Sequence, residues 1–180
     1  MIPTPMPNLS HVGIFAHDAE GLVGFYTRVF GLRVTDRGVG RNFKHTLIFL
    51  SSCPQQHHQL VIASGRPAEA TFSTVMQLSF KVPSIECLRR VRQDALDAGA
   101  TDMRGMNHGN ALSIYFADPE GNTIEVYLDT PYYVAQPHGD PLDLDKSDEE
   151  IWQETEAVCR ADPTCVPVEV WQRQFKASMN

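Results

Sequence analysis

The stretch SIYFADPEGNTIEV, from Ser113 to Val126, decides the fold that we expect for this chain. Its two apolar parts extend to Ala111–Phe116 and Asn122–Leu128, and both are typical of β-strands. Between them, Pro119 presets its own φ and Gly121 can adopt a positive φ, so this part of the stretch favours a tight turn. The sequence therefore predicts two strands joined by a turn.

The same order of elements is predicted in both halves of the chain. Strands over Leu9–Phe15 and Val75–Val82 are each followed by an amphipathic helix. Asp18 and Ser84 are the N-cap candidates of these helices, and a glycine ends each of them, at Gly31 and Gly99. Three further strand candidates complete a β-α-β-β-β order in the first half: Leu32–Thr35, Phe43–Leu50 and His57–Ala63.

An internal repeat supports this reading. A shift of 66 residues superimposes the two halves and places His11 on Gln77, Asp18 on Ser84, Phe49 on Tyr115 and Gln59 on Glu125. We therefore expect an α+β fold of paired βαβββ modules, residues 8–64 and 73–130, within one domain over residues 8–130. The two half-sheets would join into a curved mixed sheet around a cleft, which would protect their open edges.

The chain beyond residue 130 differs from this body. Eight of the 22 acidic residues but only one of the 15 basic residues lie between Asp140 and Glu156, so the rest of the chain is balanced in charge. We expect an acidic, partly helical extension over residues 131–180, draped outside the body. Ser147–Glu150 is a capping box that begins one helix, and Val168–Phe175 predicts a second. Trp152 and Trp171 either pack against the body or form a lid or dimer contact.

Composition limits the partners that we expect. The 180 residues include no apolar run near the ~18 that a membrane span needs and no segment resembling a signal peptide. A balanced body with an acidic extension disfavours nucleic acid and anionic membranes as partners. The 4 cysteines form no CxxC pair, which favours free thiols in a reducing cytoplasm. The expected partners are a small-molecule substrate and a second copy of the chain, as a homodimer.

Four pseudo-equivalent strand positions carry a set of side chains that is able to bind a metal. They hold one imidazole, one carboxylate and two amides, from His11, Glu125, Gln59 and Gln77. If the modules face each other, these groups point to one place. Nitrogen and oxygen donors favour a divalent ion such as Fe, Mn, Ni, Co or Zn over a thiolate site. Few strong ligands leave coordination positions open, as a catalytic site requires.

Three segments resemble the vicinal oxygen chelate superfamily: LSHVGIF from Leu9, GFYTRVFGL from Gly24, and the opening stretch from Ser113 to Val126. This superfamily includes glyoxalase I, type I extradiol dioxygenases, methylmalonyl-CoA epimerase, and fosfomycin and bleomycin resistance proteins. The resemblance covers residues 8–129. The extension from Thr130 onward resembles that of some extradiol-dioxygenase-like members. One fold hosts many reactions here, so the motifs specify the superfamily rather than the chemistry.

The resemblance implies a ligand set. His11 matches the metal-binding histidine of the first strand and Glu125 the metal-binding glutamate of the last strand. Gln77 stands where the dioxygenases have their second histidine, which departs from their pattern, whereas related isomerases and epimerases do use amide ligands. Gln59 stands at the fourth position, where those isomerases have Glu or Gln. The implied metal set is His11, Gln77 and Glu125, with Fe(II) as the first candidate.

The resemblance also implies three catalytic groups, each with a structural alternative. His58 resembles the histidine that serves oxygen and proton transfer, although strand alternation places it opposite to Gln59 unless the strand is bulged. His108 resembles a histidine that contacts a substrate hydroxyl, but it also suits a turn. Tyr115 resembles a tyrosine that hydrogen-bonds a catecholate oxygen, but it also suits a strand core.

The resemblance leaves three functions open. The first is a metal-dependent extradiol-type dioxygenase-like enzyme that acts on an aromatic vicinal diol, with His58, His108 and Tyr115 managing protons. The second is a glyoxalase- or epimerase-type lyase or isomerase, which the amide positions favour. The third is a ligand-binding protein of the resistance type without turnover.

Overall fold

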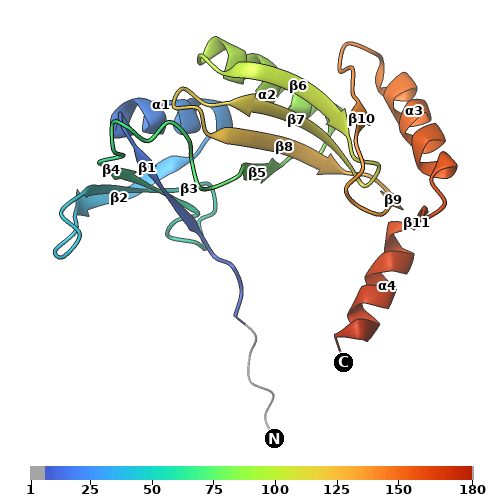
Figure 1. Cartoon of the computed structure of the whole chain (residues 1–180), viewed down its shortest axis with the longest axis horizontal. Coiled ribbons are helices and arrows are strands. Elements are labelled where there is room, and N and C mark those ends of the chain that lie inside the picture. The colour runs from blue at the N-terminus through green and yellow to red at the C-terminus, as the bar shows by residue number, and fades with distance from the viewer. Residues whose placement is uncertain (1–6, 180) are drawn as a thin grey trace, which may run out of the picture. The chain divides into compact units, whose positions relative to one another are not determined.

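The computed structural model describes residues 7–179, which form two compact units, with the second beginning at Met76. The first unit carries one helix and one four-stranded sheet in the order β1-β4-β3-β2 (Figure 1). β1 runs parallel to β4, and the other neighbours are antiparallel. Its elements are β1 (Val12–Ala16), α1 (Ala19–Phe30), β2 (Arg33–Val39), β3 (Thr46–Ser51) and β4 (Leu60–Ser64). This is the predicted β-α-β-β-β order.

The predicted helix signals of the first unit are confirmed. The Asp18 side chain accepts a hydrogen bond from the Gly21 backbone at 3.0 Å, and Gly31 ends α1 with φ of 65°. The buried face of α1 is set by helical spacing, since its inward residues recur every three to four positions: Leu22, Val23, Phe25, Tyr26 and Val29. In β1, Ile14 and Ala16 are buried and Phe15 is exposed, as strand alternation requires.

The second unit repeats this order. Its elements are β5 (Leu78–Lys81), α2 (Ile85–Asp97), β6 (Thr101–Asn107), β7 (Ala111–Ala117) and β8 (Thr123–Asp129). The sheet order is β6-β7-β8-β5, again with its first strand, β5, parallel to its last, β8. The Ser84 cap and the positive φ of Gly121 in the β7–β8 turn are confirmed. The predicted α+β class of paired βαβββ modules is therefore confirmed.

The sequence analysis missed one strand of the second unit, β6. Its sequence TDMRGMN carries no apolar alternation, Asp102 has a φ of 56°, and the pairing with β7 shifts between Thr101 and Arg104. Such a bulged strand gives no period-2 signal. The joining of the two sheets around a cleft and the domain boundary at residue 130 remain predictions.

The extension belongs to the second unit and is attached to it at several points. Its elements are β9 (Tyr132–Tyr133), β10 (Asp140–Pro141), α3 (Asp148–Ala161), β11 (Val166–Pro167) and α4 (Val168–Ser178). β10 adds to the sheet beside β6, and Arg89 and Arg92 of α2 bond the acidic residues Asp148 and Asp145. The acidic extension is therefore attached to the second unit through a strand pairing and through ion pairs to α2. The capping box of α3 is present as predicted.

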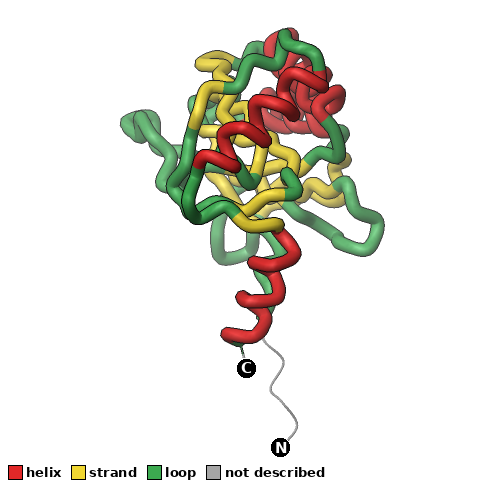
Figure 2. Tube along the Cα trace, turned by 90° about the vertical axis from the view of Figure 1, so that its right-hand side faces the viewer, coloured by secondary structure: helices red, strands yellow, loops and turns green. Residues whose placement is uncertain are grey.

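The two tryptophans of the extension lie on different helices. Trp152 is half-buried in α3, whereas α4 has no buried residue and ends near the C-terminus (Figure 2). Trp171 of α4 stacks on Tyr133 of β9 with ring centroids 5.2 Å apart. Both rings belong to the extension, so this contact does not decide between the alternatives for Trp171. Over the described residues, no helix is long and apolar enough to cross a bilayer.

Candidate functional site

One row of side chains crosses the open face of the second unit's sheet. Cross-strand pairing aligns Arg104 of β6 with Tyr115 of β7, Tyr115 with Glu125 of β8, and Glu125 with Ser79 of β5. The opposite face holds the apolar residues that bury against α2, among them Ile114, Phe116 and Ile124. Because alternate strand residues face opposite sides, the packing of this core fixes the direction of the polar row.

Glu125 is the centre of this row, and the residue is only 9% exposed. Its Oε1 accepts hydrogen bonds from the Tyr115 hydroxyl at 2.5 Å and from Ser113 at 3.0 Å. Its Oε2 accepts bonds from the Ser79 hydroxyl at 2.6 Å and from the Gln77 amide nitrogen at 2.8 Å. All four donors are uncharged, so they orient the carboxylate without neutralising it. The arrangement leaves a nearly buried negative charge that a cation would stabilise.

Gln77 lies beside Glu125. It precedes β5 by one residue, and its Nε2 also donates to the Ser79 hydroxyl at 3.0 Å. Within residues 7–179, its Oε1 has no hydrogen-bond partner. The amide oxygen is therefore the atom that Gln77 has left for a ligand.

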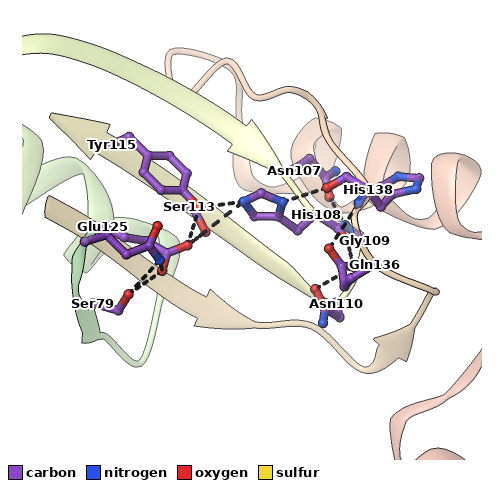
Figure 3. Close-up of polar contacts among 11 residues, drawn as sticks. Ser79, Asn107, His108, Gly109, Asn110, Ser113, Tyr115, Glu125, Gln136 and His138 are labelled. Carbon is purple, nitrogen blue, oxygen red and sulfur yellow. Dashed lines mark hydrogen bonds and ion pairs between the residues drawn. The ribbon is translucent and has the colours of Figure 1, made fainter. Parts of the chain in front are cut away.

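Tyr115 and His108 extend the network away from Glu125 (Figure 3). His108 lies in the turn between β6 and β7, and its Nε2 is 2.8 Å from the Tyr115 hydroxyl and 4.0 Å from Glu125 Oε1. Burial and the hydrogen bond to Glu125 raise the pKa of Tyr115 well above its usual value, so the phenol keeps its proton at neutral pH. The Arg104 guanidinium lies 5.0 Å above the Tyr115 ring.

Proton counting shows what this network holds. His108 Nδ1 lies 2.7 Å from the backbone carbonyl of His138, and a carbonyl oxygen only accepts, so Nδ1 carries a proton. Two contacts remain, one from His108 Nε2 to the Tyr115 oxygen and one from that oxygen to Glu125 Oε1. Each needs one proton to be a hydrogen bond, so the two contacts need two protons. A neutral imidazole of this tautomer, a phenol and a carboxylate supply one. The Tyr115 hydroxyl can therefore donate to Glu125 or to His108 Nε2, but not to both at once.

These groups line an open cavity of about 270 Å³ in the second unit. The wall combines two tyrosines and the Ala111 side chain with four polar residues. Its residues are His108, Asn110, Ala111, Tyr115, Glu125, Tyr127 and Gln136. Such a pocket, partly aromatic and with a few convergent polar groups, suits a small ring-bearing molecule.

The first unit holds the other predicted site residues. His11 lies one residue before β1, and its ring centroid is 4.2 Å from that of His58. His58 precedes β4 rather than lying within it, so strand alternation does not direct its ring. Gln59 instead turns to the end of β3, where its Oε1 accepts bonds from the Ser52 backbone and hydroxyl, both at 3.0 Å. His11 thus has His58 as its neighbour.

The metal set divides between the units, His11 in the first and Gln77 with Glu125 in the second, so its convergence remains a prediction. Over the described residues, neither unit gathers three His, Cys, Asp or Glu side chains in a metal-binding arrangement. The donor chemistry does fit a divalent cation: a carboxylate held by four uncharged donors beside a free amide oxygen in one unit, and an exposed imidazole in the other.

Sequence reasoning missed several members of the network. Ser113 and Ser79 lie two residues before Tyr115 and two residues after Gln77, so strand alternation alone would have placed them on the same face. In the extension, the Gln136 side chain donates to the His108 backbone carbonyl, and the His138 backbone carbonyl contacts the His108 ring. No local sequence pattern predicts such contacts.

Comparisons with known proteins agree with the fold. Residues 8–126 match the family model of the Glyoxalase/Bleomycin resistance protein/Dioxygenase superfamily. A biphenyl-2,3-diol 1,2-dioxygenase from Rhodococcus globerulus is 23% identical over 131 residues, which are 70% of this chain. The chain spans 65% of the length of that relative.

Two solved structures share the fold. A glyoxalase/bleomycin resistance protein/dioxygenase domain from Frankia sp. EAN1pec aligns with a TM-score of 0.58 and 20% identity, over 70% of this chain and 100% of that one. The fosfomycin resistance protein FosX from Listeria monocytogenes, solved with Mn(II) and sulfate, aligns with a TM-score of 0.55 and 18% identity, over 70% and 95%. The family model covers most of the chain, and the chain therefore belongs to the Glyoxalase/Bleomycin resistance protein/Dioxygenase superfamily.

Proposed function

We propose that the protein is a metal-dependent, extradiol-type dioxygenase-like oxidoreductase that acts on an aromatic vicinal diol. One observation carries the proposal: His108, the Tyr115 hydroxyl and the Glu125 carboxylate are linked at 2.8 and 2.5 Å, and all three line one cavity. A diol needs a group that takes its proton and a group that holds the resulting oxyanion. The similarity to a biphenyl-diol dioxygenase supports the same assignment.

His11, Gln77 and Glu125 would hold the divalent ion, with Fe(II) as the first candidate and Mn, Ni, Co or Zn as alternatives. When bound, the ion would act as a Lewis acid towards two vicinal oxygens and, as iron, would also conduct electrons. A carboxylate with four uncharged donors and a free neighbouring amide oxygen supports this placement.

Within the second unit, Tyr115 and His108 would manage the substrate protons. The raised pKa of Tyr115 keeps its hydroxyl protonated. The hydroxyl donates to Glu125 in this structure, and it would turn to a diol oxygen once the carboxylate binds the ion. His108 Nε2 is directed towards the same place, because its Nδ1 is engaged by the His138 carbonyl. It can accept a proton as the diol ionises. The rings of Tyr115 and Tyr127 would flank the aromatic ring of the substrate.

His58 would serve as a second proton-transfer group, in the first unit. Partial burial and the neighbouring His11 and His57 hold the pKa of His58 below its usual value. A mostly neutral imidazole at physiological pH can accept a proton from the reacting molecule. Its ring contact with His11 supports a position beside the metal set.

The proposed reaction cleaves the carbon–carbon bond next to the two hydroxyl-bearing carbons. Both atoms of one O2 molecule enter the ring-opened product, so O2 is the oxidant, the ring is oxidised and no external reductant is needed.

Gln77 favours a second candidate, a lyase or isomerase of the glyoxalase or epimerase type. A neutral amide beside Glu125 replaces an imidazole and weakens the case for oxygen chemistry. In such an enzyme the ion would stabilise an enediolate while a nearby base moves a proton. A resistance-type binding protein without turnover is the third alternative.

The proposal also covers the setting of the enzyme. It takes residues 8–130 as the catalytic domain and residues 131–180 as an extension, acting as a homodimer in a reducing cytoplasm. Free thiols at Cys53, Cys87, Cys159 and Cys165 are compatible with that compartment.

A ring-cleavage assay tests the proposal. The Fe(II)-loaded chain is mixed with biphenyl-2,3-diol under air, and O2 consumption is measured together with the absorbance of the ring-opened product. We expect one O2 per product and a loss of about 100-fold or more in His108→Gln, since general acid–base groups contribute 10²–10⁴-fold. Tyr127→Phe, in the same cavity, is the matched control. No O2 uptake with any of the five metals would overturn the dioxygenase assignment.

A further inference from the structure

The orientation of His108 is set from outside the family match. The match ends at residue 126, whereas the acceptor of His108 Nδ1 is the backbone carbonyl of His138, at 2.7 Å. In Figure 3 the imidazole lies between this carbonyl and the Tyr115 hydroxyl. The segment over residues 134–140, here called the strap, therefore determines which ring nitrogen of His108 faces the cavity.

The reason is the chemistry of the acceptor. A carbonyl oxygen accepts and never donates, so the contact is a hydrogen bond only if the proton is on Nδ1. In the neutral ring, Nε2 then carries the lone pair and lies 2.8 Å from the Tyr115 oxygen, so it accepts a hydrogen bond whenever the Tyr115 hydroxyl is not donating to Glu125. The opposite tautomer would leave two lone pairs facing each other at His138 and would point an N–H at the site.

Gln136 ties the strap to the turn that carries His108. Its Nε2 donates to the His108 carbonyl at 2.9 Å and to Asn110 Oδ1 at 3.3 Å, and its Oε1 accepts from the His138 backbone N–H at 3.1 Å. The Gln136 amide thus holds both Asn110, the residue before β7, and His138, whose carbonyl contacts the His108 imidazole. Loss of the Gln136 amide would free the His138 carbonyl to move.

Contacts behind the strap keep it in place. Val134 is fully buried, and a Cβ on Gly109 would come within 2.4 Å of it, so the strap packs closely on the His108 turn. The His138 ring lies between Asp140 and Asp162, at 3.0 and 3.5 Å.

We propose that the strap is a positioning element of the catalytic site, which locks His108 in the Nδ1–H tautomer and directs Nε2 to Tyr115. The inference rests on the proposed function only for the role of His108 as a proton acceptor. The enzyme would then need its extension for catalysis, not only for stability. Gln136 is the side chain that makes the strap rigid at this point.

The test reads the tautomer directly. The full, metal-free chain is labelled with ¹⁵N-histidine, and long-range ¹H–¹⁵N correlation spectra report which ring nitrogen of His108 is protonated in the neutral ring. We expect Nδ1–H alone in the wild type and a mixture of tautomers in Gln136→Met. Gln153→Met is the matched control, because Gln153 is exposed on α3 and, within residues 7–179, bonds only Glu149 of its own helix.

Activity gives a second reading. In the ring-cleavage assay, Gln136→Met should lower kcat about 10- to 100-fold, as losses of supporting hydrogen bonds at active sites do, with KM little changed. Gln153→Met should match the wild type in both. An Nε2–H tautomer in the wild type, or an unchanged tautomer in Gln136→Met, would overturn the inference. A wild type without turnover but with the expected tautomer pattern would instead count against the proposed function alone.

Discussion

Replacement of Tyr115 by phenylalanine isolates the hydrogen bond at the centre of the site. The phenyl ring still fills the same space, so the variant loses the hydroxyl and creates almost no cavity. The lost contact is a bond to Glu125 at 2.5 Å, and hydrogen bonds to charged groups contribute about 1.5–3 kcal/mol. Ser113, Ser79 and Gln77 remain on the carboxylate, so the cost should stay near that range.

We therefore expect Tyr115→Phe to lower the free energy of unfolding of the metal-free chain by about 1.5–3 kcal/mol. At about 2–4 °C per kcal/mol for a chain of this size, the melting temperature falls by about 3–12 °C. Thermal unfolding followed by circular dichroism measures both. Tyr127→Phe is the control, because the Tyr127 hydroxyl has no hydrogen-bond partner within residues 7–179. Equal melting temperatures for the two variants would refute the bond to Glu125.

The difference should also depend on pH. Burial and Glu125 raise the pKa of Tyr115 above the ordinary value of 10.0, so folding favours the protonated phenol. A raised pKa gives stability that is fully present below the unfolded value and is lost as pH rises. The wild-type advantage over Tyr115→Phe should therefore be constant up to about pH 10 and shrink above it. A difference that grows above pH 10 would contradict this assignment.

Three further predictions concern other parts of the second unit. Gln77→His should tighten binding of a borderline divalent ion, measured by competition with a chelator, because an imidazole is a better donor than an amide; unchanged affinity would mean that Gln77 does not face the ion. Gly109→Ala should cost about 2–5 kcal/mol in a denaturant titration, because its φ is +73° and the new Cβ would meet Val134 at 2.4 Å; wild-type stability would show that the strap is not packed on this turn. Burial raises the pKa of Cys159 to about 11, so in the native chain iodoacetamide should label it more slowly than Cys165 at pH 8, as followed by mass spectrometry; equal rates would indicate an exposed thiol.

The sequence allowed the fold to be predicted where local and periodic signals agree. Asp18, Gly31 and the Ser147 capping box were found because helix caps depend on residues only a few positions apart. Strand β6 was missed because its bulge removes the alternation on which strand prediction depends. The starts of strands were also placed too early. The predicted strand His57–Ala63 includes His58, whereas β4 begins only at Leu60.

The candidate site, like the fold, could be predicted only in part. Glu125, Gln77, Tyr115 and His108 were named from motif and spacing, and the structure brings these four together. The role of the strap was not predictable, because it acts on His108 through a backbone carbonyl 30 residues away. A pattern of side chains in the sequence does not show which distant backbone carbonyl a histidine ring nitrogen will contact.

A metal titration tests the central claim most directly, that residues from both units hold one catalytic ion. The wild type, His11→Ala and Glu125→Ala are purified without chelator, stripped, and titrated anaerobically with Fe(II), with circular dichroism confirming that each is folded. The account predicts one ion per wild-type chain and loss of binding in each variant, since each removes one of few strong donors. Full occupancy in either variant, at wild-type affinity, would contradict it.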